Sequence, residues 1–180
     1  MRRSPLVMGA VVAALLLTAV PASTVQASNP SRSTYTIYAT ICDGVGYTAR
    51  QVGQVWYITE PYWYSGPEFF LVGDHWVPSG TFRTNINHSI WTDSGSLGVS
   101  SGTFLIRGSR AGDYNGLWAW NWAQGKDGIG VGQGVGSSRG TFVKIAFPAV
   151  EPAGLPDPPH AYCSNGDPVY DSYYVVMSTY

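Results

Sequence analysis

Two glutamates stand where a pair of carboxylates could do acid–base chemistry. Glu60 and Glu68 flank residues 61–67, a segment with two prolines and a glycine that we expect to form a loop. Most glycosidases place one carboxyl group on each side of the scissile bond, so two glutamates beside one loop fit that chemistry. The spacing along the chain leaves the distance between the carboxyl groups open, and the pattern assigns no catalytic residue.

Aromatic side chains crowd the same loop. Trp56 and Tyr57 precede it, and Tyr62, Trp63 and Tyr64 follow one another inside it. Exposed rings there could stack on sugar faces or line the entrance to a site for an apolar molecule. The alternative is a loop whose rings pack on the end of the fold. We take Trp56, Tyr62, Trp63 and Tyr64 as the candidate ligand-binding residues.

Other site chemistries find less support in the chain. The histidines are His75, His88 and His160, and no two of them share a metal-ligand spacing. Glycines alternate from 128 to 136, but no Gly-Lys-Ser/Thr follows them, so this is not a phosphate loop. No Gly-x-Ser-x-Gly nucleophile elbow occurs either. We expect neither a metal nor an organic cofactor.

Charged residues are few and balanced. Ten Lys and Arg residues face eleven Asp and Glu, which gives a formal net charge of −1. A nucleic-acid-binding protein would show a basic stripe, so we expect no nucleic-acid partner. An aromatic content of 14% argues for a packed core rather than a disordered chain.

The first 27 residues have the order of a secretory signal peptide. Arg2 and Arg3 precede an apolar run from Leu6 to Val20, and small residues follow up to Ala27. A membrane anchor is the alternative, but a spanning helix needs about 20 apolar residues. We expect cleavage after Ala27, no stable membrane insertion afterwards, and a secreted, extracellular protein. The arginine pair leaves both the general and the twin-arginine export routes open.

After the signal peptide we expect a flexible leader over 28–33 and one domain over 34–180. The two cysteines, Cys42 and Cys163, lie near the two ends of that domain. In an oxidising compartment such a pair favours a disulfide. The bond would bring the ends of the domain together, as a closed barrel requires.

The domain consists of short segments with a period of two, separated by Gly, Asn, Asp and Ser, which is typical of strands and hairpins. The segments are 34–42, 54–60, 68–72, 82–91, 103–107, 117–124, 129–135, 141–147 and 173–177. Gly-Thr-Phe occurs at Gly80, Gly102 and Gly140, and each copy is predicted to open a strand. Residues 148–159 hold five prolines and cannot form a central strand. We predict an all-β fold, a single antiparallel up-and-down β-barrel of about eight strands, with a β-sandwich as the alternative.

Turn chemistry predicts which face of the meander is the core. A three-residue loop ending at Gly128 would set tryptophan side chains opposite glycines, in the pairs Trp122–Gly132, Trp120–Gly134 and Trp118–Gly136. A two-residue turn at 137–138 would bring Val143, Ile145 and Phe147 to that same face. We therefore expect the three tryptophans to be buried and Lys144, on the opposite face, to be exposed.

One stretch of the chain also resembles a known group. The series of Gly-Thr-Phe strands, an Asn-rich strand ending in Trp91, Asn-Gly-x-Trp and Gly-x-Gly-x-Gly between 76 and 147 is similar to the small secreted barrels of the allene-oxide-cyclase and dirigent-like group, especially their bacterial relatives. The resemblance implies an eight-stranded barrel around an apolar cavity and the steering of hydrophobic small molecules by shape. No catalytic residue of that group matches a position here.

These observations favour a secreted, non-catalytic barrel that binds an apolar small molecule at its mouth. A cyclase- or isomerase-like enzyme acting on a hydrophobic molecule is the second interpretation. A carbohydrate-binding module is the third. An apolar small molecule or a carbohydrate is thus the expected partner.

Overall fold

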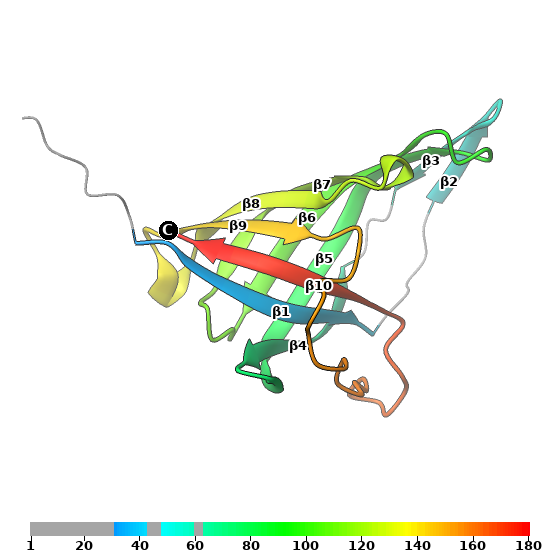
Figure 1. Ribbon diagram of the computed structural model, residues 1–180. Helices are drawn as coiled ribbons and strands as arrows, with labels where there is room; N and C mark the ends of the chain where they lie inside the picture. Colours follow the sequence, from blue (N-terminus) through cyan, green and yellow to red (C-terminus); the bar gives the residue numbers. More distant parts are fainter. Residues whose placement is uncertain (1–30, 43–47, 60–62) are drawn as a thin grey trace, which may run out of the picture. The chain divides into compact units, whose positions relative to one another are not determined.

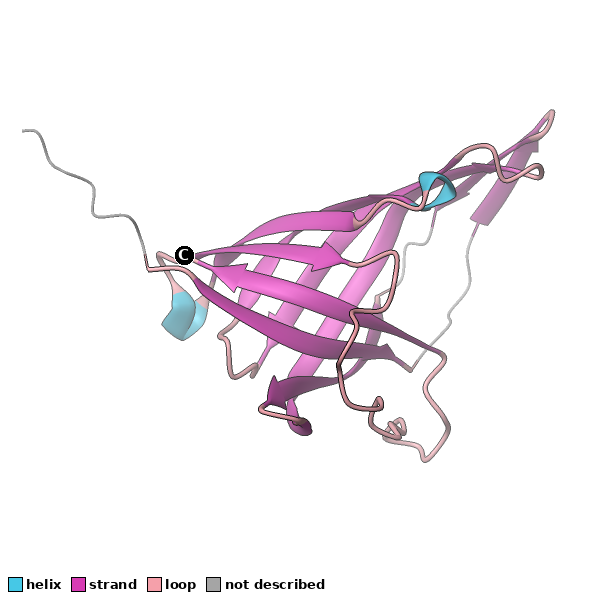
Figure 2. Ribbon diagram, viewed as in Figure 1, coloured by secondary structure: helices cyan, strands magenta, loops and turns pink. Residues whose placement is uncertain are grey.

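The computed structural model describes residues 31–42, 48–59 and 63–180, and residues 31–180 form one compact unit. The predicted signal peptide, the first part of the leader, Glu60 and Tyr62 lie outside the described residues. Nearly all regular structure is β, and the short helical segments are the 3₁₀ turns η1 (Trp122–Gln124) and η2 (Gly136–Ser138) (Figure 2).

Eight antiparallel strands close into a barrel (Figure 1). They are β1 (Ser33–Ile41), β4 (Tyr64–Val72), β5 (His75–Thr92), β6 (Gly98–Arg107), β7 (Tyr114–Asn121), β8 (Gly128–Gly134), β9 (Phe142–Phe147) and β10 (Asp171–Thr179). Each pairs with the next in this order, and β10 pairs with β1 along the whole length of β1. The prediction of an all-β, up-and-down barrel of eight strands is confirmed.

A hairpin inserted between β1 and β4 extends the sheet beyond the barrel. It consists of β2 (Thr48–Val52), which the sequence analysis missed, and β3 (Val55–Thr59). The long strand β5 pairs with β4 up to Thr84 and with β3 from Ser89 to Thr92, so its last part leaves the barrel. We call this projection, made of β2, β3, the end of β5 and the start of β6, the wing; it points away from the barrel at the upper right of Figure 1.

Strand lengths differ from the prediction because glycines and prolines lie inside strands. Pro67 belongs to β4, where a bulge follows it, so residues 64–67 are strand and not loop. Gly80 adopts a positive φ of 85° inside β5, and Gly102 lies within β6. Only the third Gly-Thr-Phe, at Gly140, immediately precedes a strand as predicted.

The barrel interior is filled by apolar side chains that alternate along the strands. One cluster of buried residues holds Ile37, Ala39, Phe70, Phe82, Phe104, Ile106, Tyr114, Val143, Ile145, Phe147, Val175 and Met177. The glycines of β7 and β8 make room for it: a Cβ on Gly132 would lie 2.9 Å from the Phe104 ring, and one on Gly130 would lie 2.7 Å from Ile145. The alternating glycines therefore leave one face bare for large side chains, as predicted.

The predicted register is right for one hairpin and wrong for the other. β8 and β9 pair as expected, with Gly130 opposite Ile145. β7 and β8 do not, because β7 ends at Asn121 and a 3₁₀ turn follows in place of a tight loop. Trp118 therefore lies opposite Gly130 and not Gly136. The shift is an even number of residues, so the face is kept: Lys144 is exposed and Trp118 is half-buried, but Trp122 is exposed.

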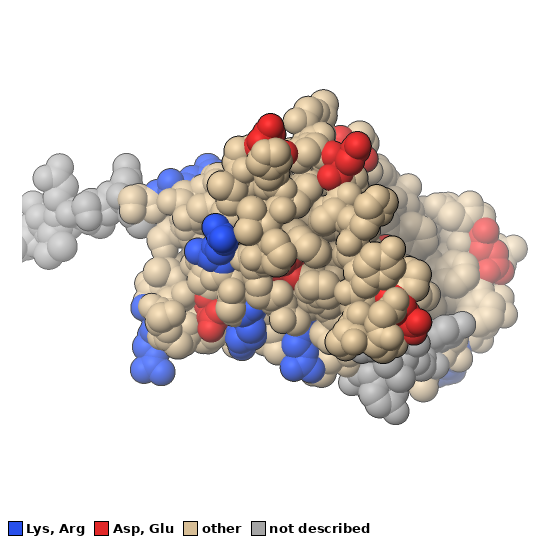
Figure 3. Space-filling view, turned by 90° about the horizontal axis from the view of Figure 1, so that it is seen from below, with Lys and Arg blue, Asp and Glu red and all other residues tan. Residues whose placement is uncertain are grey.

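One side of the barrel is covered by the segment 148–170, which crosses the outside of β1 and β10. Trp76 Nε1 donates to the carbonyl of Pro156 at 3.2 Å, and the Tyr174 hydroxyl donates to Glu151 at 2.7 Å. Both aromatic rings also pack on Tyr38, which is buried. The side seen from below, in Figure 3, carries charged residues of both signs scattered over a largely uncharged surface.

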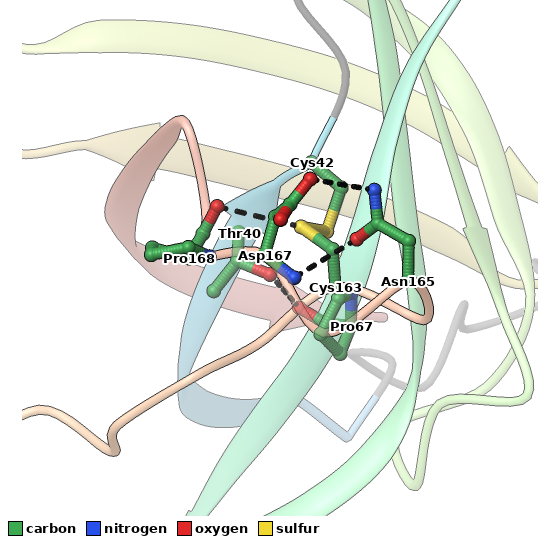
Figure 4. The surroundings of a disulfide bond; sticks show 7 residues. All are labelled: Thr40, Cys42, Pro67, Cys163, Asn165, Asp167 and Pro168. Carbon is green, nitrogen blue, oxygen red and sulfur yellow. Dashed lines mark hydrogen bonds between the residues drawn. A yellow bond between two sulfur atoms is a disulfide. The ribbon is translucent and has the colours of Figure 1, made fainter.

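The Cys42–Cys163 disulfide anchors this segment to the end of β1 (Figure 4). It joins residues 121 positions apart with a Cα–Cα distance of 5.4 Å. Beside it, Asn165 and Asp167 hold the turn that carries Cys163, and Thr40 donates to the carbonyl of Pro67 at 2.7 Å. The predicted disulfide is confirmed.

Candidate functional site

Tryptophans gather on the inner side of the sheet where the wing leaves the barrel. Five of the seven in the chain lie there: Trp56, Trp91, Trp118, Trp120 and Trp122. The register shows why, because directly paired residues of neighbouring strands point to the same face. We call these five residues the tryptophan face, and we call the end of the barrel where β7 ends and β8 begins the mouth.

On the wing, two of these rings stack. Trp56 of β3 pairs with Trp91 of β5, and their rings lie 5.7 Å apart at 16°. Trp56 Nε1 donates to Asp93 Oδ1 at 2.6 Å, and Gln51 donates to the other carboxylate oxygen at 3.4 Å. The Asp93 carboxylate therefore fixes the orientation of the Trp56 ring in the stacked pair, and both rings are half-buried.

Beside this pair, two more tryptophan rings lie against glycines of β6, where no side chain covers the backbone. A Cβ on Gly98 would lie 2.6–2.7 Å from three ring atoms of Trp122, so the indole lies with its face on the bare backbone. Trp122 is nevertheless 38% exposed, so part of its side chain remains open to solvent. Trp118 lies on Gly102 in the same manner, with a ring atom 2.9 Å from the position of a Cβ there.

At the mouth itself Trp120 continues the apolar surface into the barrel. Its ring stacks on Phe147 at 6.5 Å and 17°, and its edge meets Tyr173. Trp120 and Tyr173 are half-buried, whereas Phe147 belongs to the core. The tryptophan face is therefore continuous with the apolar interior.

Most of the indole N–H groups on this face are already used. Trp118 donates to Thr84 at 2.8 Å, Trp120 to the carbonyl of Lys126 at 2.7 Å, and Trp122 to Ser100 at 3.2 Å. With Trp56 bound to Asp93, four of the five indoles have an internal acceptor. What these rings offer a ligand is carbon surface.

The residues chosen from the sequence are spread over different places. Trp56 belongs to the tryptophan face, and Tyr62 lies outside the described residues. Trp63 lies on the opposite, outer side of the sheet, under the guanidinium of Arg83, whose Cζ is 5.5 Å from the ring centroid. Tyr64 begins β4 and its side chain is buried.

Four residues of the tryptophan face were not proposed as ligand contacts from the sequence. Trp91 joins the face through its pairing with β3, which no local pattern shows. Trp118, Trp120 and Trp122 were assigned to the core because of their alternation, and a longer connection between β7 and β8 leaves Trp122 outside it. Their spacing correctly predicted that the three side chains share one face, but it did not predict how far that face is exposed.

Glu68 is the other chemically notable side chain. It points into the barrel and is 1% exposed, with Ser109 donating to Oε1 at 2.6 Å; Oε2 has no hydrogen-bond partner among the described residues. Burial raises the pKa of the Glu68 carboxyl to about 7, and the Ser109 hydrogen bond opposes part of that shift. Ser109 belongs to the loop 108–113, whose Ala111 packs on the core, so Glu68 lies toward the end of the barrel that this loop covers. Its distance from Glu60 is not defined, because Glu60 lies outside the described residues.

Among the described residues no group of three or more His, Cys, Asp or Glu side chains converges on a common point that could hold a metal ion. In the same part of the chain, no helix has the length and apolar character needed to cross a bilayer.

No family model, no curated protein and no solved structure matches this chain. The resemblance to the allene-oxide-cyclase and dirigent-like group therefore stays a prediction.

Proposed function

We propose that this protein is a non-catalytic binding protein that takes an apolar small molecule at the mouth of the barrel, against the tryptophan face. The observation that carries the proposal is the convergence of five tryptophans on one face that continues into the core. Burial of aromatic surface is worth about 25 cal/mol per Å², and stacking adds to it. Because four indole N–H groups are bonded internally, apolar contact is the main attraction these rings provide.

Carbohydrate binding is the second candidate, and one observation favours it. Trp122 is partly exposed, and Ser100, Asp93 and Gln51 bring polar atoms close to the tryptophan face. Asp93 and Ser100 are engaged with the tryptophans themselves, so fewer groups remain to hydrogen-bond sugar hydroxyls.

An isomerase- or cyclase-like reaction has weaker support. Glu68 has a pKa suited to proton transfer near neutral pH. Its carboxyl group is buried against the loop 108–113, however, and does not belong to the tryptophan face.

The disulfide supports a further part of the proposal, that the protein is exported. Disulfides form and persist in oxidising compartments, and this one anchors a covering segment that has little regular structure of its own. Together with the signal-peptide pattern, it supports a secreted, extracellular protein.

The test is a titration of the protein with N-phenyl-1-naphthylamine, a neutral apolar dye, and in parallel with a cello-oligosaccharide. We expect the dye to bind and the Trp122→Ala variant to bind it about fivefold more weakly, as the loss of one stacked ring predicts. Gly98→Val should weaken binding similarly, because a side chain at that position displaces the Trp122 ring. Tyr57→Ala is the matched control, because Tyr57 follows Trp56 in β3, is 44% exposed and therefore lies on the outer side of the sheet.

Each alternative outcome has a clear meaning. Dye binding that is lost in Tyr57→Ala and unchanged in Trp122→Ala would move the site away from the mouth. Saturable binding of the oligosaccharide without dye binding would favour the carbohydrate candidate.

A further inference from the structure

The outer side of the sheet carries a second apolar surface, unrelated to the mouth. Leu117 of β7, Ile129 and Val131 of β8, and Phe142 of β9 are 61%, 54%, 63% and 56% exposed. Leu117 and Val131 pair directly across neighbouring strands, and Phe142 pairs with Gln133 on the next. We call these four residues the outer apolar face. Contiguous apolar patches on a soluble protein mark binding sites more often than chance.

A hollow of about 610 Å³ lies on this face. Trp63 and Leu105 form one side, Leu117 and Val131 the floor, and Phe142 the other side. The row from Leu105 to Phe142 crosses three strand spacings, which is about 14 Å. Ligand-binding pockets have volumes of about 300–1,000 Å³, so this hollow matches a single small molecule better than a protein or a flat membrane.

A more polar hollow of about 600 Å³ adjoins the first, and the two share Leu117. Its walls include Thr59, Asn87, His88 and Ser101. The second hollow is also lined by Trp118 of the tryptophan face, whereas no residue of that face lines the first. The first, apolar hollow is therefore the part of this surface that is separate from the tryptophan face.

The charged residues on the strands that form this surface are all basic. The five strands β5 to β9 contain Arg83, Arg107 and Lys144 and not a single Asp or Glu. Arg107 donates to backbone carbonyls of Ile106 and Tyr114, whereas no acidic partner is found for Arg83 or Lys144 among the described residues. Arg83 lies over the ring of Trp63, which itself lines the apolar hollow. A cation therefore lies at the rim of an apolar hollow without a counter-charge from the described residues.

We propose that the apolar hollow, with Arg83 at its rim, binds one molecule of an anionic amphiphile of the long-chain carboxylate class. Its carboxylate pairs with Arg83, and its hydrocarbon part lies on Leu117, Val131 and Phe142. The charge of the strands selects the anionic head, and the exposed side chains select the apolar body. This site is independent of the tryptophan face, because the two lie on opposite sides of the same sheet.

The experiment is calorimetric titration of the full chain with dodecanoate and with dodecanol, both below their aggregation limits. We expect dodecanoate to bind about tenfold more tightly than the neutral alcohol, because a charge-assisted hydrogen bond to arginine adds affinity. Arg83→Gln should weaken dodecanoate about tenfold and leave dodecanol unchanged. Arg50→Gln, the same change of charge in β2, is the control and should alter affinity less than twofold.

A second variant tests the apolar part. Val131→Glu places a carboxylate in the hollow at a position that is 63% exposed, so the core is untouched and the melting temperature should stay the same. Val131→Glu should abolish dodecanoate binding. Trp122→Ala changes the tryptophan face on the other side of the sheet, so it should leave dodecanoate binding intact. Equal affinity for acid and alcohol, or binding that survives Val131→Glu, would overturn the proposal. So would binding to phosphatidylglycerol vesicles without any binding of free dodecanoate.

Discussion

The two outer sides of this barrel differ in what covers them. Outside β1, β10 and the start of β5, the aromatic residues Tyr38, Trp76 and Tyr174 pack on one another beneath the segment 148–170. Outside β7, β8 and β9, none of the segments that the structure describes covers the outer apolar face, and its four residues are more than half exposed. Both sides carry apolar residues on the solvent-facing positions of the strands, so the difference lies in the connections.

Connection length explains the difference. The links β6–β7, β7–β8 and β8–β9 are short turns over 108–113, 122–127 and 135–141, which cannot reach back over a strand. The link between β9 and β10 spans 148–170 and lies against the strands, where the disulfide anchors it. Apolar residues under the long connection thus contribute to the fold, whereas those beside the short turns are free to contribute to binding.

Loss of the disulfide should have the largest effect on the covered side. In the chain-entropy model, a crosslink that closes a loop of 121 residues contributes about 4–5 kcal/mol to the free energy of unfolding. We expect the Cys42→Ser, Cys163→Ser double variant to lose about that much in urea unfolding at 25 °C. Limited proteolysis should then cut within 148–170 first. A double variant as stable and as resistant as the parent would show that the covering segment is held by its other contacts alone.

The buried acid inside the barrel, Glu68, should give the next largest effect. Unfolding returns the pKa of Glu68 from about 7 to its ordinary value of 4.5, so the folded state binds the proton more tightly. The contribution of the neutral carboxyl to stability is complete below pH 4.5 and is lost as the pH rises through 7. Between pH 5 and pH 8 we expect the free energy of unfolding to fall by about 2–3 kcal/mol from this group.

Glu68→Gln supplies the control for that loss, because the amide cannot ionise. The variant should show a flatter dependence of unfolding free energy on pH from 5 to 8, measured by urea unfolding at each pH. Parallel curves for the parent and the variant would mean that Glu68 does not titrate in this range.

The fold could be predicted because its determinants are local. Alternation marked the strands, and glycine at every second position of β8 marked the side where Phe104 and Ile145 pack. The register of β8 with β9 followed from one turn. The register of β7 with β8 did not, since the chain between Asn121 and Gly128 forms a 3₁₀ turn whose length no residue type dictates.

The candidate site could be predicted only in part, because its pieces come together through long-range pairing. Trp56 was among the ligand-binding residues predicted from the sequence, but Trp91, which stacks on it, lies 35 positions later in the chain. The outer apolar face was missed for a related reason. Leu117, Val131 and Phe142 alternate with core residues of the same strands, and alternation alone does not show which faces another segment covers.

A matched pair of substitutions compares how much the covered side and the bare side contribute to the free energy of unfolding. The effects expected here are the smallest of those predicted. Trp76→Thr and Phe142→Thr each replace an aromatic residue on the outside of the barrel with a β-branched residue that keeps strand propensity. Trp76 packs on Tyr38 and Tyr174 and donates to Pro156, so its loss should lower the free energy of unfolding by about 2 kcal/mol, below the range for a fully buried ring.

Phe142 is 56% exposed on the outer apolar face, so Phe142→Thr should change the free energy of unfolding by less than about 0.5 kcal/mol. Urea unfolding of both variants under the same conditions gives the comparison. Equal losses would mean that the outer apolar face is as much a part of the folded core as the covered side, and would remove the reason to regard it as a binding surface.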